Sequence, residues 1–255
     1  MTGAPLGHGF RLLELGAVGS TNDVARELAD QGEPEGLFVQ AAEQTAGRGR
    51  HGRTWQSPPG NLHASLLLRP TRPMAEVATL SLVAALALAE AVAELSGGAV
   101  QPRLKWPNDV QIDGAKVAGI LLEAASDARG ACSWLIIGMG VNVAAAPGAE
   151  VPYATTSLVE AGLANVTPAT LVRALAAAMR PRLDQWLAQG FAGPRPAWLA
   201  RAADAGAHVQ VRLGERVVGG RMLDVDATGA LRLEDASGEV ERFTAGEVSV
   251  QRFVG

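Results

Sequence analysis

The sequence predicts an α+β protein in two parts, a larger part of helices and strands and a smaller part of strands only. Hydrophobic residues make up 48% of the 255 residues and charged residues only 19%, which is typical of a chain with a folded core. Helix-like and strand-like apolar segments alternate up to about residue 205. From Gly206 onward only short alternating segments remain, which is the pattern of a small β-barrel.

The larger part begins with a helix predicted after Ser20. Ser, Thr, Asn and Asp accept hydrogen bonds from the free amides of a helix start, and Gly32 ends this helix. Apolar runs between glycines and prolines predict the other elements. We expect strands at 37–42, 62–68, 103–106, 110–112, 116–123 and 133–143, and helices at 75–95, 168–189 and 194–203. Asp113-Gly114 predicts a hairpin turn, and Pro181 is expected to kink or divide its helix.

The smaller part is predicted to contain strands at 208–213, 217–225, 230–234, 240–243 and 248–253. Turns at Gly214, Gly229 and Gly238 separate several of them. We therefore place a domain boundary near Ala205, between a domain of residues 1–205 and a domain of residues 206–255.

Composition excludes several classes of protein. Cys132 is the only cysteine, so neither an internal disulfide nor a cysteine-based zinc site is predicted, and the four histidines lack ligand spacing. The N-terminus has no signal-peptide pattern, and the apolar run 77–89 is shorter than the roughly 20 residues that span a bilayer. We interpret that run as a buried core helix and expect a cytoplasmic protein. The net charge of −4 argues against nucleic-acid binding by bulk charge.

A basic, glycine-rich segment at 47–55 is the first candidate site. Three arginines, Arg48, Arg50 and Arg53, lie among glycines that let the backbone approach a ligand. Guanidinium groups suit phosphates and carboxylates, and their mutual repulsion predicts a loose loop until an anion binds. The G-x-G-x-x-G match does not indicate a dinucleotide site, because Ser57-Pro58-Pro59-Gly60 prevents the following helix. The alternative is a solvated basic loop without a ligand.

Two further segments offer polar groups at strand ends. Lys116 follows the predicted hairpin turn and opens an apolar strand, so its ammonium group either points into a cleft or is solvated. Gly138 and Gly140 interrupt another apolar strand, which usually marks a bulge or a close approach to the backbone. Asn142 then supplies one acceptor and two donors nearby.

These segments, in this order, closely resemble the biotin protein ligases. The matching residues are Ser20-Thr21-Asn22, Gln44-Thr45-Ala46-Gly47-Arg48-Gly49-Arg50, Lys105-Trp106-Pro107-Asn108-Asp109, Lys116-Val117-Ala118-Gly119-Ile120-Leu121 and Gly138-Met139-Gly140-Val141-Asn142. The resemblance covers nearly the whole chain. It implies a mixed β-sheet flanked by helices, as in the class II synthetase-like biotin and lipoate ligases, with a C-terminal SH3-like β-barrel.

The resemblance also implies a two-step reaction. The biotin carboxylate attacks the α-phosphate of ATP, giving biotinyl-5′-AMP and pyrophosphate, and a lysine of a biotin carboxyl carrier protein domain then takes the biotinyl group. Magnesium accompanies ATP, and no tightly bound prosthetic group is implied. Only nineteen residues precede Ser20, too few for the helix-turn-helix repressor domain of some family members, so we expect no DNA binding. The carrier belongs to acetyl-CoA carboxylase or a related enzyme, and a homodimer is compatible with the family.

The resemblance assigns roles to individual residues. Lys116, as a fixed positive charge, reaches the biotin carboxylate and the α-phosphate, and Arg50 retains the adenylate. The catalytic residues are Lys116, Arg50 and Asp109; the biotin-binding residues are Ser20, Thr21, Asn22, Gln44, Arg48, Arg50, Lys116, Gly119 and Leu121; the ATP- and adenylate-binding residues are Gly47, Arg48, Arg50, Arg53, Trp55, Lys116 and Asn142. Ser20 to Asn22 could instead form only a helix cap. Asp109 could guide the incoming lysine, hold magnesium or anchor the turn after Pro107.

Three rival functions stay open at this point. A lipoate or octanoate ligase or transferase shares the implied fold, although the basic loop and the C-terminal barrel favour biotin. A non-catalytic biotin sensor would need an interaction module that the sequence does not indicate. An RNA-binding protein is disfavoured by the acidic total and the few aromatic residues. His51 stands where the family loop often has another arginine, so the charge of the loop is expected to depend partly on pH.

Overall fold

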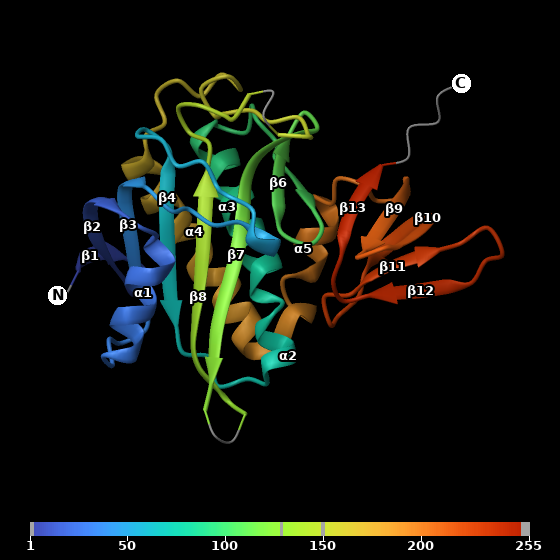
Figure 1. Ribbon diagram of the computed structural model, residues 1–255, viewed down its shortest axis with the longest axis horizontal. Helices are drawn as coiled ribbons and strands as arrows, with labels where there is room; N and C mark the ends of the chain where they lie inside the picture. Colours follow the sequence, from blue (N-terminus) through green and yellow to red (C-terminus); the bar gives the residue numbers. More distant parts are fainter. Residues whose placement is uncertain (1–2, 128–129, 149–150, 251–255) are drawn as a thin grey trace.

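The computed structural model describes residues 3–127, 130–148 and 151–250, which form two sheets and five α-helices (Figure 1). The helices are α1 (Thr21–Asp30), α2 (Met74–Val77), α3 (Leu80–Leu95), α4 (Pro168–Gln189) and α5 (Arg195–Ala200), with short 3₁₀ helices η1 (Arg50–Gly52) and η2 (Gly190–Ala192). The first sheet contains β1 (Ala4–Gly7), β2 (Phe10–Val18), β3 (Leu37–Gln44), β4 (Leu62–Leu68), β5 (Arg103–Lys105), β6 (Asp109–Ile112), β7 (Ala115–Ser126) and β8 (Cys132–Val141). The second contains β9 (His208–Leu213), β10 (Arg216–Val225), β11 (Leu231–Glu234), β12 (Val240–Phe243) and β13 (Glu247–Val250).

The first sheet is mixed, as predicted. Its strand order is β1-β2-β3-β4-β8-β7-β6-β5, with β2 and β3 parallel and the other neighbours antiparallel. The hairpin of β1 and β2 was not predicted from the sequence. Most residues of β2 after Leu12 are exposed or half-buried, so this strand lacks the clear apolar alternation of the central strands. The turn between β6 and β7 was predicted, and both Asp113 and Gly114 have positive φ angles there.

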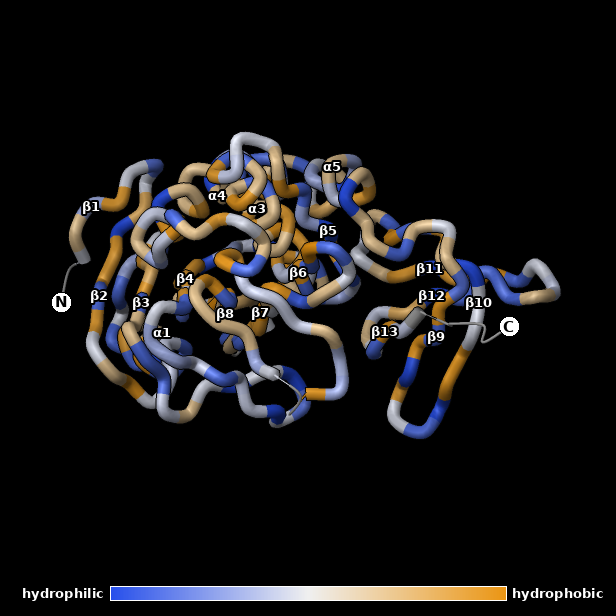
Figure 2. The backbone as a smooth tube through the Cα atoms, turned by 90° about the horizontal axis from the view of Figure 1, so that it is seen from above, coloured by the Kyte–Doolittle hydropathy of each residue, from blue (hydrophilic) through white to orange (hydrophobic). Residues whose placement is uncertain are grey.

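Each face of the first sheet has its own hydrophobic core. Helix α1 packs on one face, where Ala25 and Leu28 meet β3, β4 and β8. Helices α3 and α4 cover the opposite face, and α3 is buried on nearly all sides (Figure 1). A helix that is apolar all round belongs in the centre of a fold. In Figure 2, many of the hydrophobic residues accordingly lie around α3 and α4.

The apolar segment Met74–Leu95 is long and apolar enough to cross a membrane by composition alone, but 72% of its most apolar window is buried inside the protein. The prediction of a buried core helix is therefore confirmed. The prediction of one continuous helix at 75–95 was wrong, because a turn at Ala78 and Thr79 separates α2 from α3. The Thr79 hydroxyl donates to the Glu76 carbonyl at 2.6 Å and accepts from Trp186 Nε1 at 2.8 Å. Both hydrogen bonds hold the turn that separates α2 from α3.

Helix α4 runs without interruption through Pro181, so the expected division at this residue is not present. An internal proline costs about 3 kcal/mol in a helix. Buried side chains on both sides of it, among them Leu175, Met179, Leu183 and Trp186, pack into the main core and offset that cost. The helix has the predicted bounds, and the Thr167 side chain caps its start.

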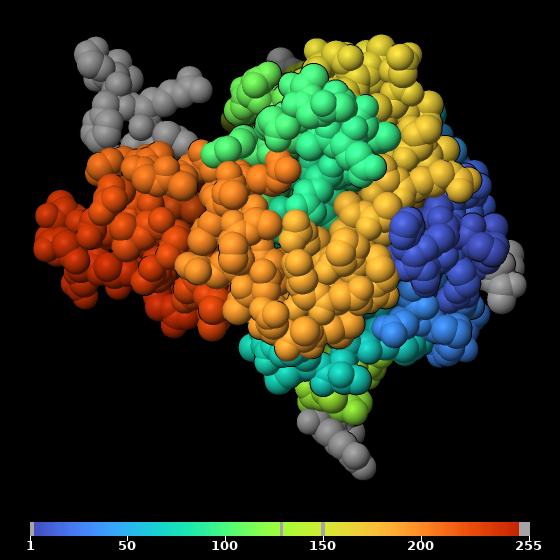
Figure 3. All heavy atoms as spheres, turned by 180° about the vertical axis from the view of Figure 1, so that it is seen from behind, coloured from blue at the N-terminus to red at the C-terminus, as the bar shows by residue number. Residues whose placement is uncertain are grey.

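The second sheet has five antiparallel strands in the order β12-β11-β10-β9-β13, which agrees with the expected SH3-like module. Gly214, Gly229 and Gly238 all have positive φ angles in its turns. Figure 3 shows this part as a lobe at one end of the larger body. Trp106 Nε1 donates to the Gly229 carbonyl at 3.0 Å and so joins the two parts. The end of the predicted strand 248–253 lies outside the described residues, and the boundary near Ala205 stays a prediction.

Candidate active site

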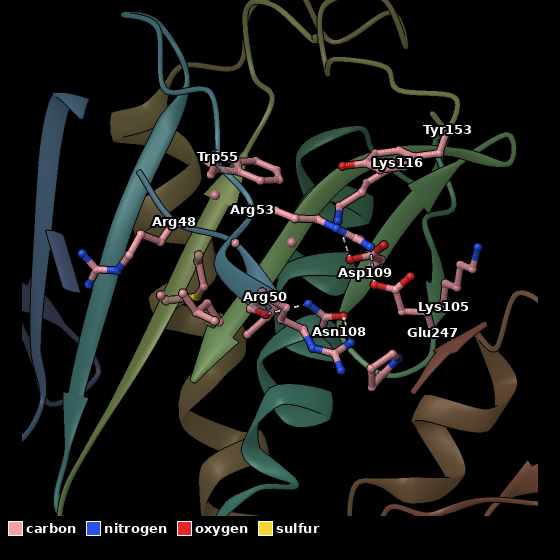
Figure 4. A pocket seen from close by; sticks show the side chains of 18 of the residues that line it. Arg48, Arg50, Arg53, Trp55, Lys105, Asn108, Asp109, Lys116, Tyr153 and Glu247 are labelled. Atoms are coloured by element: carbon pink, nitrogen blue, oxygen red, sulfur yellow. Dashed lines mark hydrogen bonds and ion pairs between the residues drawn. The ribbon is translucent and has the colours of Figure 1, made fainter. Parts of the chain in front are cut away.

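A cavity of about 400 Å³ lies where α1, the basic loop, β6 to β8 and the start of β13 meet. The predicted site residues that line it are Ser20, Thr21, Asn22, Gln44, Arg48, Arg50, Arg53, Trp55, Asp109, Lys116, Gly119 and Leu121. They come from segments far apart in the sequence, as the close-up view shows (Figure 4). Gly47 and Asn142 are the predicted residues that the cavity lining does not include.

The end of the cavity beside α1, here called the uncharged end, is built from neutral polar side chains. Gln44 Oε1 accepts from the Thr21 amide at 2.8 Å and from the Thr21 hydroxyl at 3.0 Å. Ser65 donates to Asn22 Oδ1 at 2.6 Å, and the Ser20 side chain caps α1. These residues do form the helix cap that the sequence allowed, but they line the cavity as well. Asn22 Nδ2 is buried and has no hydrogen-bond partner within the described chain.

The two glycines of β8 make room for side chains that cross the sheet surface. A Cβ atom on Gly138 would lie 2.4 Å from Asn22 Oδ1, and one on Gly140 would lie 2.3 Å from Trp55 Cε2. Both distances are far inside van der Waals contact. The close approach that the strand glycines predicted is therefore made, at Gly138 by an amide of the uncharged end and at Gly140 by the Trp55 indole.

Lys116 lies at the other end of the cavity, here called the charged end. Its Nζ atom lies 2.7 Å from Asp109 Oδ1, 5.6 Å from the centre of the Trp55 ring and 5.4 Å from the centre of the Tyr153 ring (Figure 4). A lysine between two aromatic rings and a carboxylate has few rotamers left. Asp109 is therefore an ion-pair partner that orients Lys116, a role that none of the three sequence interpretations included.

The three arginines of the basic loop have different partners. Arg48 makes two hydrogen bonds to Asp23, at 2.7 and 2.8 Å, and one to Glu123 at 3.1 Å. Its hydrogen bonds with Asp23 lower the pKa of that carboxyl below its usual value and raise the pKa of Arg48. The Arg48 side chain consequently ties the loop to α1 and β7, and in Figure 4 it extends away from Lys116.

Arg50 and Arg53 reach the second sheet. Arg53 Nη2 lies 2.5 Å from Glu247 Oε1, and the Arg50 guanidinium contacts the Gly246 carbonyl at 3.4 Å and Asn108 Oδ1 at 3.2 Å. Burial lowers the pKa of Arg50, while Asp109 and Glu247 act in the opposite direction. Burial alone would raise the pKa of Glu247, but Arg53 lowers it below its usual value. Residues from the second sheet thus complete the wall of the cavity.

These partners change the expectation of a loose loop. That expectation rested on repulsion between positive charges that have no counter-ion. In the structure Asp23 and Glu123 neutralise Arg48, Glu247 pairs with Arg53, and Asp109 pairs with Lys116. Backbone bonds between Gly49 and Arg53 and between Gly47 and Trp55 also close the loop on itself. The internal carboxylates therefore remove most of the repulsion.

Gly47 and Asn142, which do not line the cavity, make contacts within the protein that support its local structure. A Cβ atom on Gly47 would lie 2.5 Å from the Trp55 carbonyl oxygen, so this glycine allows the two arms of the loop to touch. Asn142 is 1% exposed and donates to the Thr156 carbonyl at 3.1 Å. Its direct contact with a nucleotide remains a prediction for which the geometry offers no support.

Sequence reasoning missed Tyr153 and Glu247, and it assigned no role to Asn108, although all three line the cavity. Tyr153 is the only tyrosine in the chain and lies in a loop that pairs with Lys116 through its backbone. Glu247 lies far along the sequence in a different sheet. A half-buried acid at the start of a strand carries no sequence signal for a contact with an arginine loop, so only the structure could reveal it.

Comparisons with known proteins identify the family to which the chain is similar. Residues 16–142 match the model of the biotin/lipoate A/B protein ligase family, and residues 205–251 match that of the biotin protein ligase C-terminal domain. A biotin–[acetyl-CoA-carboxylase] ligase of Paracoccus denitrificans is 42% identical over 88% of this chain and 94% of that protein. A bifunctional ligase/repressor, BirA of Bacillus subtilis, is 34% identical over 93% of this chain and 73% of its own length.

Solved structures show the same relationship. The biotin protein ligase of Aquifex aeolicus in complex with biotin and ATP has a TM-score of 0.78, is 27% identical, and covers 94% of this chain and 98% of its own. The biotin protein ligase of Leishmania major in complex with biotinyl-5-AMP has a TM-score of 0.66, is 29% identical, and covers 92% of this chain and 98% of its own. Together with the curated relatives, they show that the chain belongs to the biotin protein ligase family.

Proposed function

We propose that this protein is an ATP-dependent biotin ligase that forms biotinyl-5′-AMP and transfers the biotinyl group to a lysine of a biotin carboxyl carrier protein. One observation carries the proposal: a single cavity joins a neutral hydrogen-bonding end at Asn22 and Gln44 to a cationic end at Lys116 and Arg50. Biotin has the same division, with an uncharged ureido ring at one end and a carboxylate at the other.

The first step brings two anions together, and Lys116 would supply the positive charge between them. The biotin carboxylate oxygen attacks the α-phosphorus, the bond to the β-phosphate bridging oxygen breaks, and pyrophosphate leaves. A preorganised charge in a partly enclosed site stabilises this transition state far better than mobile water does. Asp109 and the rings of Trp55 and Tyr153 limit the movement of the ammonium group, so little reorganisation is needed when the reactants bind.

The uncharged end would bind the ureido ring. Asn22 Nδ2 is a buried donor that has no hydrogen-bond partner among the described residues, and a ligand carbonyl is the acceptor that would satisfy it. Gln44, Ser20 and Thr21 lie beside it on the same wall. A buried urea left with an unpaired polar group loses about 1–3 kcal/mol of binding free energy for each such group. This requirement favours biotin over lipoate or octanoate, whose ring or chain ends have no urea.

Arg50 and Trp55 would retain the adenylate between the two steps. Arg50 carries a permanent positive charge at the cavity wall, and the Trp55 indole lies over Gly140 beside Lys116. In the second step the carrier lysine attacks the biotinyl carbonyl carbon, the bond to the AMP oxygen breaks, and a proton leaves the amine.

Magnesium belongs to the proposal as the ion that accompanies ATP. Mg²⁺ usually takes one or two carboxylates together with phosphate oxygens and water. Asp109 and Glu247 are the carboxylates that line the described part of the cavity, so this donor set fits. When bound, the ion would neutralise charge on the phosphates.

The proposal also includes partners and location. The acceptor is a carrier domain of acetyl-CoA carboxylase or a related enzyme, and the reaction takes place in the cytoplasm. With a net charge of −4 we expect no general DNA binding. Strand β1 is the outermost described strand on its side of the first sheet, and an edge of this kind would allow a homodimer to form by strand pairing.

The test is to follow pyrophosphate release with ATP, magnesium and biotin, in the presence and absence of a carrier domain. We expect biotin-dependent pyrophosphate and biotinylation of the carrier lysine. Faster turnover with lipoate or octanoate would favour the related ligases of the same fold. Tight biotin binding without pyrophosphate would indicate a non-catalytic sensor and would overturn the proposal.

A further inference from the structure

We infer that Asn108 is a positioning residue that holds the Arg50 guanidinium at the cavity wall. This inference rests on the proposed function, in which Arg50 retains the adenylate. Arg50 Nη1 donates to Asn108 Oδ1 at 3.2 Å, and Asn108 Nδ2 donates to the Ile120 carbonyl at 2.8 Å (Figure 4). Asn108 therefore links the basic loop to strand β7.

The Asn108 side chain is held in one orientation. The Ile120 amide also donates to the Asn108 backbone carbonyl at 2.9 Å, so side chain and backbone bind the same residue of β7. Ile120 is 2% exposed and belongs to the main core, which makes it a rigid anchor. A flipped amide would place its NH₂ group against the guanidinium, donor against donor, and two oxygens against each other at Ile120. The acceptor of Asn108 must therefore face Arg50.

The neutral character of this contact sets Arg50 apart. Arg48 and Arg53 both form ion pairs with carboxylates, whereas the hydrogen-bond partners described for Arg50 are the uncharged oxygens of Asn108 and Gly246. A guanidinium whose hydrogen bonds go to neutral oxygens forms no direct ion pair among the described residues, so a phosphate can bind it without displacing a carboxylate. Asn108 thus provides orientation, and the charge at the site comes from Arg50.

Loss of the Asn108 contact should increase escape of the adenylate from the cavity. Without Asn108, the long Arg50 side chain recovers rotamer freedom and keeps only the two 3.4 Å contacts to Gly246. The adenylate would then leave the cavity more often before the carrier arrives, and free adenylate reacts with lysines of other proteins. Losing a hydrogen bond to a charged group corresponds to about a tenfold effect.

The experiment is a double-mutant cycle of N108A and R50A. The readout is the ratio of biotin attached to a bystander protein to biotin attached to the carrier domain. We expect N108A to raise this ratio about tenfold in the wild-type background and to leave it within about twofold in the R50A background, because both variants remove one interaction. If N108A is not folded at the assay temperature, N108S replaces it in the same cycle.

N61A is the matched control. Asn61 is a buried asparagine whose side chain likewise holds a loop: its Oδ1 accepts from the amides of Val143, Ala144 and Ala145. It is absent from the cavity lining, so N61A should lower the melting temperature and leave the labelling ratio at the wild-type value. This control separates a general loss of structure from a loss of adenylate retention.

Two results would overturn the inference alone: a wild-type ratio for N108A, or an effect of N108A that persists at full size in the R50A background. A wild-type protein that releases no biotin-dependent pyrophosphate would overturn the proposed function together with this inference.

Discussion

The two ends of the cavity differ in how their polar groups are satisfied before any ligand binds. At the uncharged end, Gln44, Thr21 and Ser65 bind one another, while the buried amide donor of Asn22 has no partner in the described parts of the chain. At the charged end, Lys116 and Arg53 are paired with Asp109 and Glu247. The first arrangement suits a neutral ligand that adds to an existing network. In the second, an incoming anion competes with protein carboxylates for the same cations.

The largest effect is expected for K116M, which removes the central charge of the charged end and keeps most of the side-chain volume. Removing one preorganised electrostatic contact costs about 100- to 1,000-fold in rate. We expect biotin-dependent pyrophosphate release to fall by at least about 100-fold, measured with saturating ATP.

Lys105 provides the comparison for that variant, since it is the other lysine of the chain and lies at the edge of the same cavity. K105M should have a far smaller effect, because within the described residues Lys105 pairs with none of the aromatic rings and carboxylates that surround Lys116. Equal losses in both variants would mean that net positive charge matters and the position of Lys116 does not.

Adding one methyl group at Gly138 or at Gly140 should affect the two ends of the cavity differently. In G138A the new Cβ atom collides with Asn22, and in G140A it collides with Trp55. Both collisions force a side chain to move, at a cost of about 1–3 kcal/mol. We therefore expect G138A to raise the KM for biotin about tenfold with a smaller change for ATP, and G140A to show the reverse pattern.

Steady-state kinetics with each substrate varied in turn would check this pair, and melting temperatures would confirm that both variants fold. If each variant raised both KM values equally, the division into two chemically distinct ends would be incorrect.

Salt is expected to have a moderate effect that differs between the ends. Screening weakens contacts between charges, and the Debye length falls from about 10 Å at 0.1 M to about 3 Å at 1 M ionic strength. Raising potassium chloride from 0.05 to 0.5 M should therefore raise the KM for ATP severalfold, while the KM for biotin changes by less than about twofold. If the KM values for ATP and biotin rose to the same extent, charge would control binding at both ends.

The smallest effect concerns stability at the β4 strand, which carries Ser65 of the uncharged end. His63 is 1% exposed; its burial lowers its pKa, and a hydrogen bond with the Pro58 carbonyl opposes this only in part. The unfolded chain, with a histidine pKa near 6.5, therefore binds the proton more readily than the folded protein. Stability is complete above about pH 6.5 and decreases below it, by at most about 1.4 kcal/mol per pH unit.

Urea unfolding at pH 7.5 and 5.5 would measure this decrease. H63Q, which cannot be protonated in this range, should lose less stability than the wild type over the same interval. An identical pH dependence in both proteins would exclude His63 as its source.

The sequence predicted elements wherever a strong local pattern specified them. Strand β4 and strand β9 have the predicted bounds, because each is a clear apolar or alternating run between turn residues. The β1–β2 hairpin was missed because it lies at the edge of the sheet, where half-exposed residues blur the alternation. The break before α3 was missed because it depends on Thr79 meeting Trp186 from a distant helix.

The same limit applies to the site. Motif spacing brought together most of the predicted lining residues, since the strands that carry them are neighbours in the sheet. The partner of each charged group could not be read from the motifs. Arg48 and Arg53 are five residues apart, yet one binds Asp23 and the other binds Glu247 in the second sheet. Tertiary packing decides such pairings, and local composition does not encode them.

A crystal structure of this protein with biotinyl-5′-AMP bound would show directly whether the two ends of the cavity bind the two chemically different ends of the ligand. We predict that the ureido ring lies at the uncharged end, with its carbonyl accepting a hydrogen bond from Asn22 or its neighbours, and that the phosphate contacts Lys116 and Arg50. A ligand bound in the reverse orientation, or outside the cavity between α1 and Lys116, would contradict it.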